Sequence, residues 1–140
     1  MNEIIFIASD HAGFDLKKQI LSSIKVNLID LGADSKNSVD YPDYAKKLVS
    51  KINSNKNSKG ILICGSGVGM SIAANRDKNI RAGLAFKCEI AKLIREHNDA
   101  NVLILPGRFM DIQEALICIR NFLTTNFEGK RHRNRINKLT

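Results

Sequence analysis

The chain alternates short apolar runs with longer segments in which apolar residues recur at helical spacing. Runs rich in Ile, Leu and Val predict five strands, at residues 4–8, 26–31, 60–64, 81–85 and 102–105. Recurrence every three or four residues predicts helices at residues 13–24, 42–53, 69–75, 88–97 and 111–126. Because the strand runs are apolar throughout, we expect a sheet buried on both faces. The pattern predicts a doubly wound, Rossmann-like α/β domain with a five-stranded parallel sheet, helices on both faces and a C-terminal helical tail.

Length and cysteine content narrow the class of protein. With 140 residues, the chain is expected to form one domain over residues 1–140, large enough to bury a core without disulfides. Its three cysteines are an odd number without CxxC spacing, and no secretory signal pattern opens the chain. We therefore expect a reduced, cytoplasmic protein. No apolar run approaches the roughly 18–20 residues needed to cross a bilayer, so we expect no membrane partner.

The net charge of +8 is concentrated at the C-terminus. Five of the 22 Lys and Arg residues lie in residues 130–140, which contain no acidic residue, so the rest of the chain has 17 basic against 14 acidic side chains. A basic tail suits a nucleic-acid or anion-binding module, and this remains an alternative to an enzyme. The chain has no Trp, few aromatic residues and none of the common binding-module signatures, so we expect no nucleic-acid partner.

An apolar run passes directly into a glycine-rich turn and a helix in residues 60–75, GILICGSGVGMSIAAN. Gly65, Gly67 and Gly69 allow backbone N–H groups to converge on an anion, and the positive end of the helix dipole points the same way. Cys64 would lie in that field, which favours the reactive thiolate form of a cysteine. The pattern indicates acid/base or covalent chemistry on an anionic substrate, although a tight turn beside a structural thiol is the alternative. The loop matches neither GxxxxGK[ST] nor GxGxxG, so ATP and NAD are not indicated.

Other polar residues lie near the ends of the predicted strands and helices. In open parallel sheets, ligands bind beyond the carboxyl ends of the strands. Asp10 either caps the following helix or takes part in chemistry, and His11 at a helix start is expected to face a bound anion. Ser66 lies within the glycine turn and either caps the next helix or contacts substrate. His97 and Asn98 end the fourth predicted helix, where an imidazole either complements the dipole or acts in catalysis.

Arginines supply candidate phosphate contacts. Arg108 follows the fifth predicted strand in the sequence PGR. Arg131 and Arg135 are four residues apart, so a helical tail would direct both guanidinium groups to one face, with Arg133 facing elsewhere. A solvated basic tail is the alternative.

A metal site is not expected from the residue spacing. The three histidines, His11, His97 and His132, show no short ligand spacing such as HExxH and have no dense carboxylate cluster beside them. We therefore predict no metal ligands.

Several blocks occur in order along nearly the whole chain: SDHAGFDLK, DYPDYA, GILICGSGVGMSIAANR, REHNDANVL, PGR and EGKRHRNRI. With these blocks the chain resembles the ribose-5-phosphate isomerase B family of sugar-phosphate isomerases, which also includes galactose-6-phosphate isomerase subunits. The resemblance implies interconversion of ribose 5-phosphate and ribulose 5-phosphate through an enediolate, without a cofactor. A hexose 6-phosphate, such as allose or galactose 6-phosphate, is the alternative substrate.

The resemblance also implies roles for individual residues. Cys64 is expected to be the base that moves the proton between C1 and C2. Some family members carry a glutamate a few positions later instead, whereas residues 69–71 here read Gly-Met-Ser, as in the cysteine type. His97 is expected to be the acid that opens the furanose ring, Asn98 to bind substrate, and Asp10 to assist at the ring oxygen or hydroxyl groups.

The remaining implied contacts are with the enediolate oxygens and the phosphate. The expected anion hole is the turn formed by Gly65, Ser66, Gly67, Val68 and Gly69. The expected phosphate ligands are His11, Arg108, Arg131 and Arg135. In the family the site is built between two subunits, with tail arginines reaching into the partner's pocket. The resemblance therefore implies a homodimer or dimer of dimers, with the tail from about residue 127 packing on the partner subunit.

Overall fold

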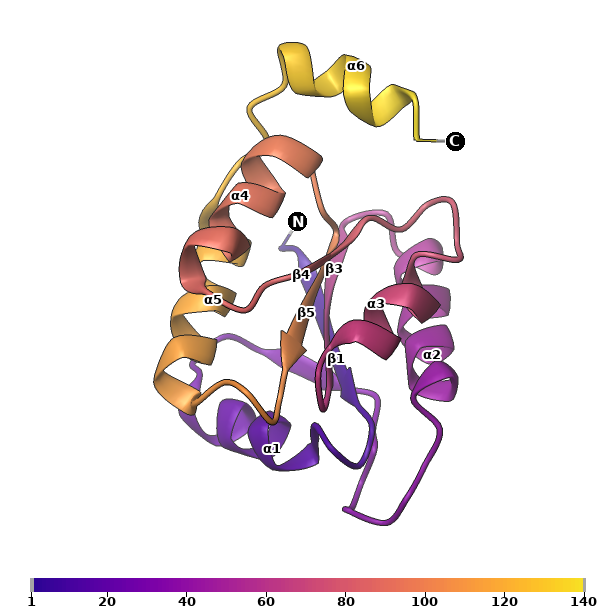
Figure 1. The fold of residues 1–140 in the computed structure, drawn as a ribbon, viewed down its shortest axis with the longest axis vertical. Helices are drawn as coiled ribbons and strands as arrows, with labels where there is room; N and C mark the ends of the chain where they lie inside the picture. The colour runs from indigo at the N-terminus through magenta and orange to yellow at the C-terminus, as the bar shows by residue number, and fades with distance from the viewer. Residues whose placement is uncertain (1, 140) are drawn as a thin grey trace.

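Five parallel strands form one sheet in the order β2-β1-β3-β5-β4 (Figure 1). The computed structural model describes residues 2–139. The strands are β1 (Ile4–Ser9), β2 (Leu28–Asp30), β3 (Ser58–Cys64), β4 (Ala82–Leu84) and β5 (Val102–Pro106). The last residues of β1, β3 and β5 lie side by side, because Ser9 pairs with Ile63 and Cys64 with Pro106. We call this end of the sheet the carboxyl end and the opposite one the amino end.

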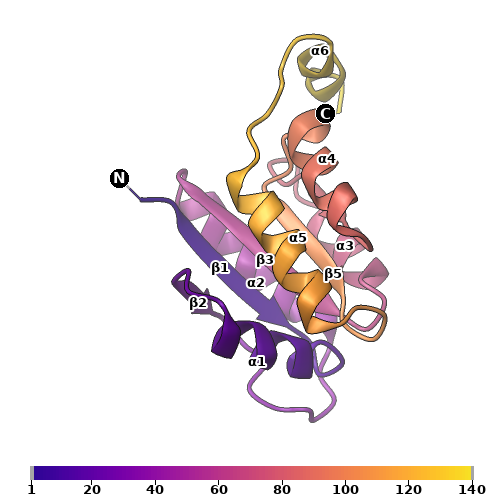
Figure 2. The same ribbon diagram turned by 90° about the vertical axis from the view of Figure 1, so that its left-hand side faces the viewer.

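Helices cover both faces of the sheet (Figure 2). They are α1 (Phe14–Ser23), α2 (Tyr41–Ser54), α3 (Val68–Ala74), α4 (Cys88–Asn98), α5 (Ile112–Thr124) and α6 (Arg131–Asn137). Residues from α1, α4 and α5 pack on one face, and residues from α2 and α3 pack on the other. The predicted doubly wound fold is thus confirmed. Within residues 2–139, no helix is long and apolar enough to cross a membrane.

The alternation of side chains along β3 builds the core on both faces. Ile61 and Ile63 contribute to the cluster beneath α1, α4 and α5, whereas Leu62 and Cys64 belong to the cluster beneath α2 and α3. All four side chains are 5% exposed or less. Since both faces are buried here, residues 61–64 of this strand are all apolar, which explains the continuous run in the sequence.

The central strands agree closely with the sequence pattern, and the edge strands are shorter. Residues 26–31 were expected to be extended, but only Leu28–Asp30 form β2, and β4 is likewise limited to Ala82–Leu84. Each edge strand has a neighbour on one side only, so its ladder ends where that pairing ends. The tail is helical as expected: α6 lies beyond the amino end of the sheet and next to the end of α4 (Figures 1 and 2).

A buried ion pair anchors the connection between β2 and α2. Lys17 of α1 is 1% exposed, and its Nζ donates to Asp30 Oδ1 at 2.7 Å and to the carbonyl oxygen of Ala33 at 2.6 Å. The same Asp30 oxygen accepts from the N–H of Gly32 at 2.9 Å. Buried charges need such partners, and Lys17 therefore ties this connection to the first helix.

Replacing Lys17 with methionine should lower the free energy of unfolding by about 1–3 kcal/mol, because a buried carbonyl and a partly buried carboxylate lose their donor. Lys18→Met is the matched control, since the neighbouring lysine is exposed. It should change stability by less than about 0.5 kcal/mol. Urea unfolding measures both variants, and equal stabilities would contradict the anchoring role.

Candidate active site

The loop after β1 holds a buried carboxylate at the carboxyl end. Asp10 is 6% exposed, and its Oδ1 accepts from the N–H of Gly13 at 3.0 Å. Its own N–H donates to the carbonyl oxygen of Ile63 at 3.2 Å, which ties the loop to β3. Gly13 is required here, because an added Cβ would lie 2.4 Å from that same carbonyl oxygen. Asp10 thus stabilises the turn into α1, and it also lies at the predicted site.

His11 is held by a backbone donor from a distant segment. The N–H of Val39 donates to His11 Nδ1 at 3.1 Å. A neutral imidazole that accepts at Nδ1 carries its proton on Nε2, so the ring presents an N–H donor at its other side. This is the form suited to a hydrogen bond with a phosphate oxygen.

The glycine turn after β3 has the backbone geometry that its sequence predicts. Gly67 has φ +80°, in the left-handed region, and an added Cβ would lie 2.5 Å from Leu84 Cδ1. The Ser66 hydroxyl accepts from the N–H of Val68, the first residue of α3, at 3.2 Å, although the N-cap position itself is Gly67. Cys64, the last residue of β3, is 5% exposed.

The loop after β5 is hydrogen-bonded to the glycine turn. The N–H of Gly107 donates to the Cys64 carbonyl oxygen at 2.7 Å, and the N–H of Arg108 donates to the Gly65 carbonyl oxygen at 2.9 Å. The Arg108 side chain lies beside the turn, because a Cβ added to Gly65 would be 3.3 Å from its Nη1. The structure therefore brings Cys64, the glycine turn and Arg108 together, with Asp10 on the adjoining strand end.

The other two cysteines are poor candidates for a base. Burial raises the pKa of Cys118 to about 12. The pKa of Cys88 is also raised, mainly because its thiol donates to the Glu89 carboxylate at 2.8 Å. Both therefore remain protonated thiols at neutral pH.

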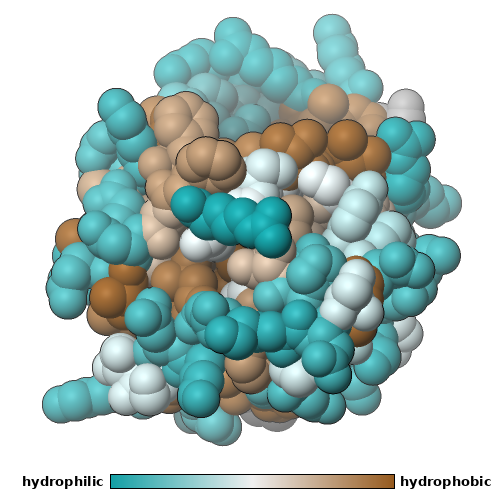
Figure 3. All heavy atoms as spheres, turned by 60° about the horizontal axis from the view of Figure 1, so that its bottom comes forward, coloured by the Kyte–Doolittle hydropathy of each residue, from teal (hydrophilic) through white to brown (hydrophobic). Residues whose placement is uncertain are grey.

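Apolar side chains are exposed at the carboxyl end, which Figure 3 turns toward the viewer. Val68, Phe86 and Phe109 follow β3, β4 and β5 and are 50%, 60% and 76% exposed. Brown surface gathers near the middle of that view, among polar side chains. Large apolar side chains gathered at one end of a molecule are typical of an interaction surface.

The structure does not bring His97 and Asn98 to Cys64 within the chain. They end α4, which runs antiparallel to the strands, so they lie at the amino end (Figure 1). At 1.5 Å per residue, His97 is about 14 Å along the helix from Cys88 at its start. Arg131 and Arg135 lie on α6 at this same end. Within a single chain the predicted site residues therefore form two groups, one at each end of the sheet.

The tail forms a second polar cluster around His97. The rings of His97 and His132 stack with centroids 4.3 Å apart and planes 15° apart. The Glu128 carboxylate lies 3.5 Å from His132 Nε2. Arg133 instead lies over the Phe127 ring at 5.2 Å, so it points away from the arginine pair, as helical spacing predicts. Burial and Arg131 lower the pKa of His132, which keeps its ring neutral at pH 7.

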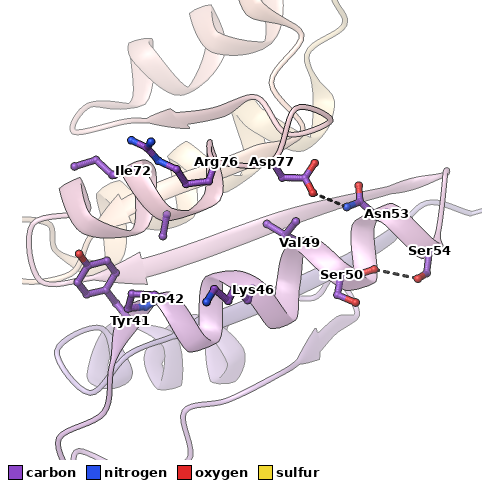
Figure 4. A pocket seen from close by; sticks show the side chains of 11 residues that line it. Tyr41, Pro42, Lys46, Val49, Ser50, Asn53, Ser54, Ile72, Arg76 and Asp77 are labelled. Carbon is purple, nitrogen blue, oxygen red and sulfur yellow. Dashed lines mark hydrogen bonds between the residues drawn. The ribbon is translucent and has the colours of Figure 1, made fainter. Parts of the chain in front are cut away.

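Two cavities lie away from Cys64. One, of about 720 Å³, runs between α2 and α3, where Tyr41 and Ile72 flank one end and Asn53 Nδ2 donates to Asp77 Oδ2 at 2.9 Å (Figure 4). The other, of about 680 Å³, lies between β4 and α6 and includes Asn98 in its wall. Cys64 lines neither of these two cavities.

Comparison with known proteins assigns the family. A sequence description of the family Ribose/Galactose Isomerase matches residues 5–139. The chain belongs to this family. It is 45% identical to the probable ribose-5-phosphate isomerase B of Mycoplasma pneumoniae over 99% of this chain and 94% of the relative. It is 38% identical to ribose-5-phosphate isomerase B of Escherichia coli K12 over 100% of this chain and 95% of the relative.

Solved structures of the ribose/galactose isomerase family share the fold. A ribose 5-phosphate isomerase of Thermotoga maritima matches with a TM-score of 0.93 and 48% identity, over 99% of this chain and 98% of that one. The Mycoplasma genitalium ribose-5-phosphate isomerase B with bound ribulose-5-phosphate matches with a TM-score of 0.92 and 44% identity, over 99% and 95%. The expected fold and family are thereby confirmed.

Two residues that contact the candidate site were not identified from the sequence. Val39 orients His11 through its backbone N–H, which side-chain patterns cannot reveal. The Tyr41 ring packs against the start of α3, where a Cβ added to Gly69 would lie 2.8 Å from it. The DYPDYA block contains Tyr41, but spacing alone does not relate it to the glycine turn.

Gly67→Ala should lower the free energy of unfolding by about 1–3 kcal/mol or more. Alanine is strained at the positive φ of this position, and its Cβ would clash with Leu84. Gly65→Ala is the control in the same turn, where an added Cβ meets the flexible end of Arg108 and should cost less. Thermal unfolding of both variants gives the comparison. Equal losses would show that the left-handed turn is not the constraint.

Proposed function

We propose that this chain is a ribose-5-phosphate isomerase that interconverts ribose 5-phosphate and ribulose 5-phosphate without a cofactor. The observation that carries the proposal is the meeting of Cys64, the glycine turn and Arg108 at the carboxyl end. The relative from Mycoplasma genitalium, 44% identical, binds ribulose-5-phosphate in its structure. The three free cysteines agree with a reducing, cytoplasmic setting.

Proton transfer between neighbouring carbons is the reaction that Cys64 serves in this proposal. Its thiolate takes the proton from C2 of the open-chain aldose, and electrons move onto the C1 carbonyl oxygen to give an enediolate. The same proton returns to C1, a proton passes from the C2 hydroxyl to the C1 oxygen, and the ketose results. N–H groups of the turn Gly65–Gly69 stabilise the negative oxygens, where preorganised donors are most effective.

Substrate contacts divide between the two ends of the chain. His11 offers its Nε2–H and Arg108 its guanidinium group to the phosphate from the carboxyl end. Asp10 is positioned there to accept from a ring or hydroxyl group. Arg131 and Arg135 complete phosphate binding from α6 of another copy.

A second copy of the chain supplies the ring-opening acid. His97 and Asn98 lie at the amino end, far from Cys64 of their own chain. A twofold dimer that seats the amino end of each subunit on the carboxyl end of its partner forms two identical sites. Burial of Val68 and Phe109 would help stabilise it, since both are exposed in the single chain. We therefore propose a homodimer or dimer of dimers in which the tail from about residue 127 packs on the partner.

Cys64→Ala should lower kcat for ribose 5-phosphate by about 10²–10⁴-fold, the usual contribution of a general base, while the fold is retained. Cys88→Ala is the matched control and should keep wild-type activity, because that thiol contacts Glu89 outside the glycine turn. Both are assayed with purified protein in chelator, with circular dichroism as the test of folding. Full activity of Cys64→Ala would exclude it as the base.

The substrate is decided by comparing kcat/KM for ribose 5-phosphate with allose 6-phosphate and galactose 6-phosphate. The proposal expects the pentose to be preferred. Preference for a hexose would retain the chemistry and change the substrate, since the family description includes both ribose and galactose isomerases. Inactivity on all three, with binding to nucleic acid that weakens steeply as salt rises, would favour the binding-module alternative.

A further inference from the structure

Three metal-ligating groups meet at the amino end. His97 from α4, Glu128 from the connection before α6, and His132 within α6 each offer one ligand atom, and these atoms lie within 4.8 Å of one another. Backbone contacts hold the segments together, because the N–H of Glu128 donates to the Glu96 carbonyl oxygen at 3.0 Å. The cluster therefore belongs to the fixed part of the tail.

His132 gives the independent sign that a ligand is missing from this cluster. The residue is 5% exposed, and its Nε2 is buried without a hydrogen-bond partner in the described residues. Stacking on His97 contacts only the ring face, and the Glu128 carboxylate, 3.5 Å from that nitrogen, makes no hydrogen bond with it. Burial of an unpaired polar atom is costly, and native proteins usually pair such atoms with protein, water or an ion.

The donor set selects the kind of ion. Two imidazoles and one carboxylate are typical zinc ligands, whereas Mg²⁺ and Ca²⁺ prefer oxygen. Bonds of about 2.0–2.2 Å in a tetrahedral zinc site put ligand atoms about 3.3–3.6 Å apart. His132 Nε2 and the nearest Glu128 oxygen, at 3.5 Å, already have this spacing. Two stacked rings cannot both direct an in-plane nitrogen at one ion, so binding requires the partly buried His97 ring to turn out of the stack. Glu128 is exposed enough to move with it.

We propose that His97, Glu128 and His132 form a binding site for Zn²⁺, with water as the fourth ligand. The consequence for activity rests on the proposed function: Zn²⁺ on His97 occupies the nitrogen that would deliver the ring-opening proton. The ion is then a reversible inhibitor of a reaction that needs no metal, and chelators restore activity. The sequence-based expectation of no metal ligands considered short spacings among the histidines and cysteines, whereas this set joins Glu128 and His132, four residues apart, to His97 from another segment.

Binding is measured first, by calorimetric titration of Zn²⁺ into the chelator-treated protein and by anomalous diffraction from a Zn²⁺-soaked crystal. One ion per chain at His97 and His132 is expected. Glu128→Gln should weaken binding at least about tenfold. Glu89→Gln, at the opposite end of α4, is the matched control and should leave the affinity unchanged. Absence of binding, or binding that is lost in Cys64→Ala and unaffected by Glu128→Gln, would overturn the site.

Inhibition is measured separately, with each variant compared with its own metal-free activity. The Zn²⁺ concentration for half-inhibition should rise at least about tenfold in Glu128→Gln, in step with its affinity. Equal sensitivity of wild type and Glu128→Gln would overturn the inhibitory role. The binding measurements require no activity, so a failure of the proposed isomerase function is distinguishable from a failure of the zinc site.

Discussion

A helix that links two neighbouring parallel strands has to run antiparallel to them, and the organisation of this protein depends on that constraint. Cys64 closes β3 at the carboxyl end, whereas His97 closes α4 at the amino end. No adjustment of loops within the chain can exchange these ends. The residues to which we assign one reaction are therefore divided between two surfaces of the same molecule, and a second copy is the simplest means of joining them.

Close backbone packing fixes the positions of the loops at the carboxyl end. Loops after β1, β3 and β5 approach one another where glycines leave no side chain, as at Gly13 against β3 and Gly67 against Leu84. Hydrogen bonds from Gly107 and Arg108 then fix the turn beside Cys64. The amino end is built differently, because the stacked rings of His97 and His132 join the tail to α4. The carboxyl end is therefore held by backbone contacts, whereas the amino end is held by a cluster of titratable side chains.

Much of this arrangement could be predicted from the sequence, because it depends on local patterns. Apolar runs located β1, β3 and β5, and the glycines identified the turn, whereas the left-handed conformation of Gly67 is known only from the structure. Contacts between distant segments could not be predicted: Val39 on His11 uses a backbone N–H, and Glu128 beside His132 depends on where the tail returns. Edge strands ended early because pairing, not composition, limits them. The division of the site roles between chains remains a prediction.

Complementation between two inactive variants tests this division most directly. Cys64→Ala and His97→Asn chains are unfolded, mixed in equal amounts and refolded, with each variant refolded alone as the control. If each site takes Cys64 from one subunit and His97 from the other, a mixed dimer has one intact site and one site that lacks both groups. Random pairing makes half of the dimers mixed, so the mixture should recover about a quarter of wild-type activity. If the mixture is no more active than the separate variants, Cys64 and His97 do not act across subunits and the two-chain site is contradicted.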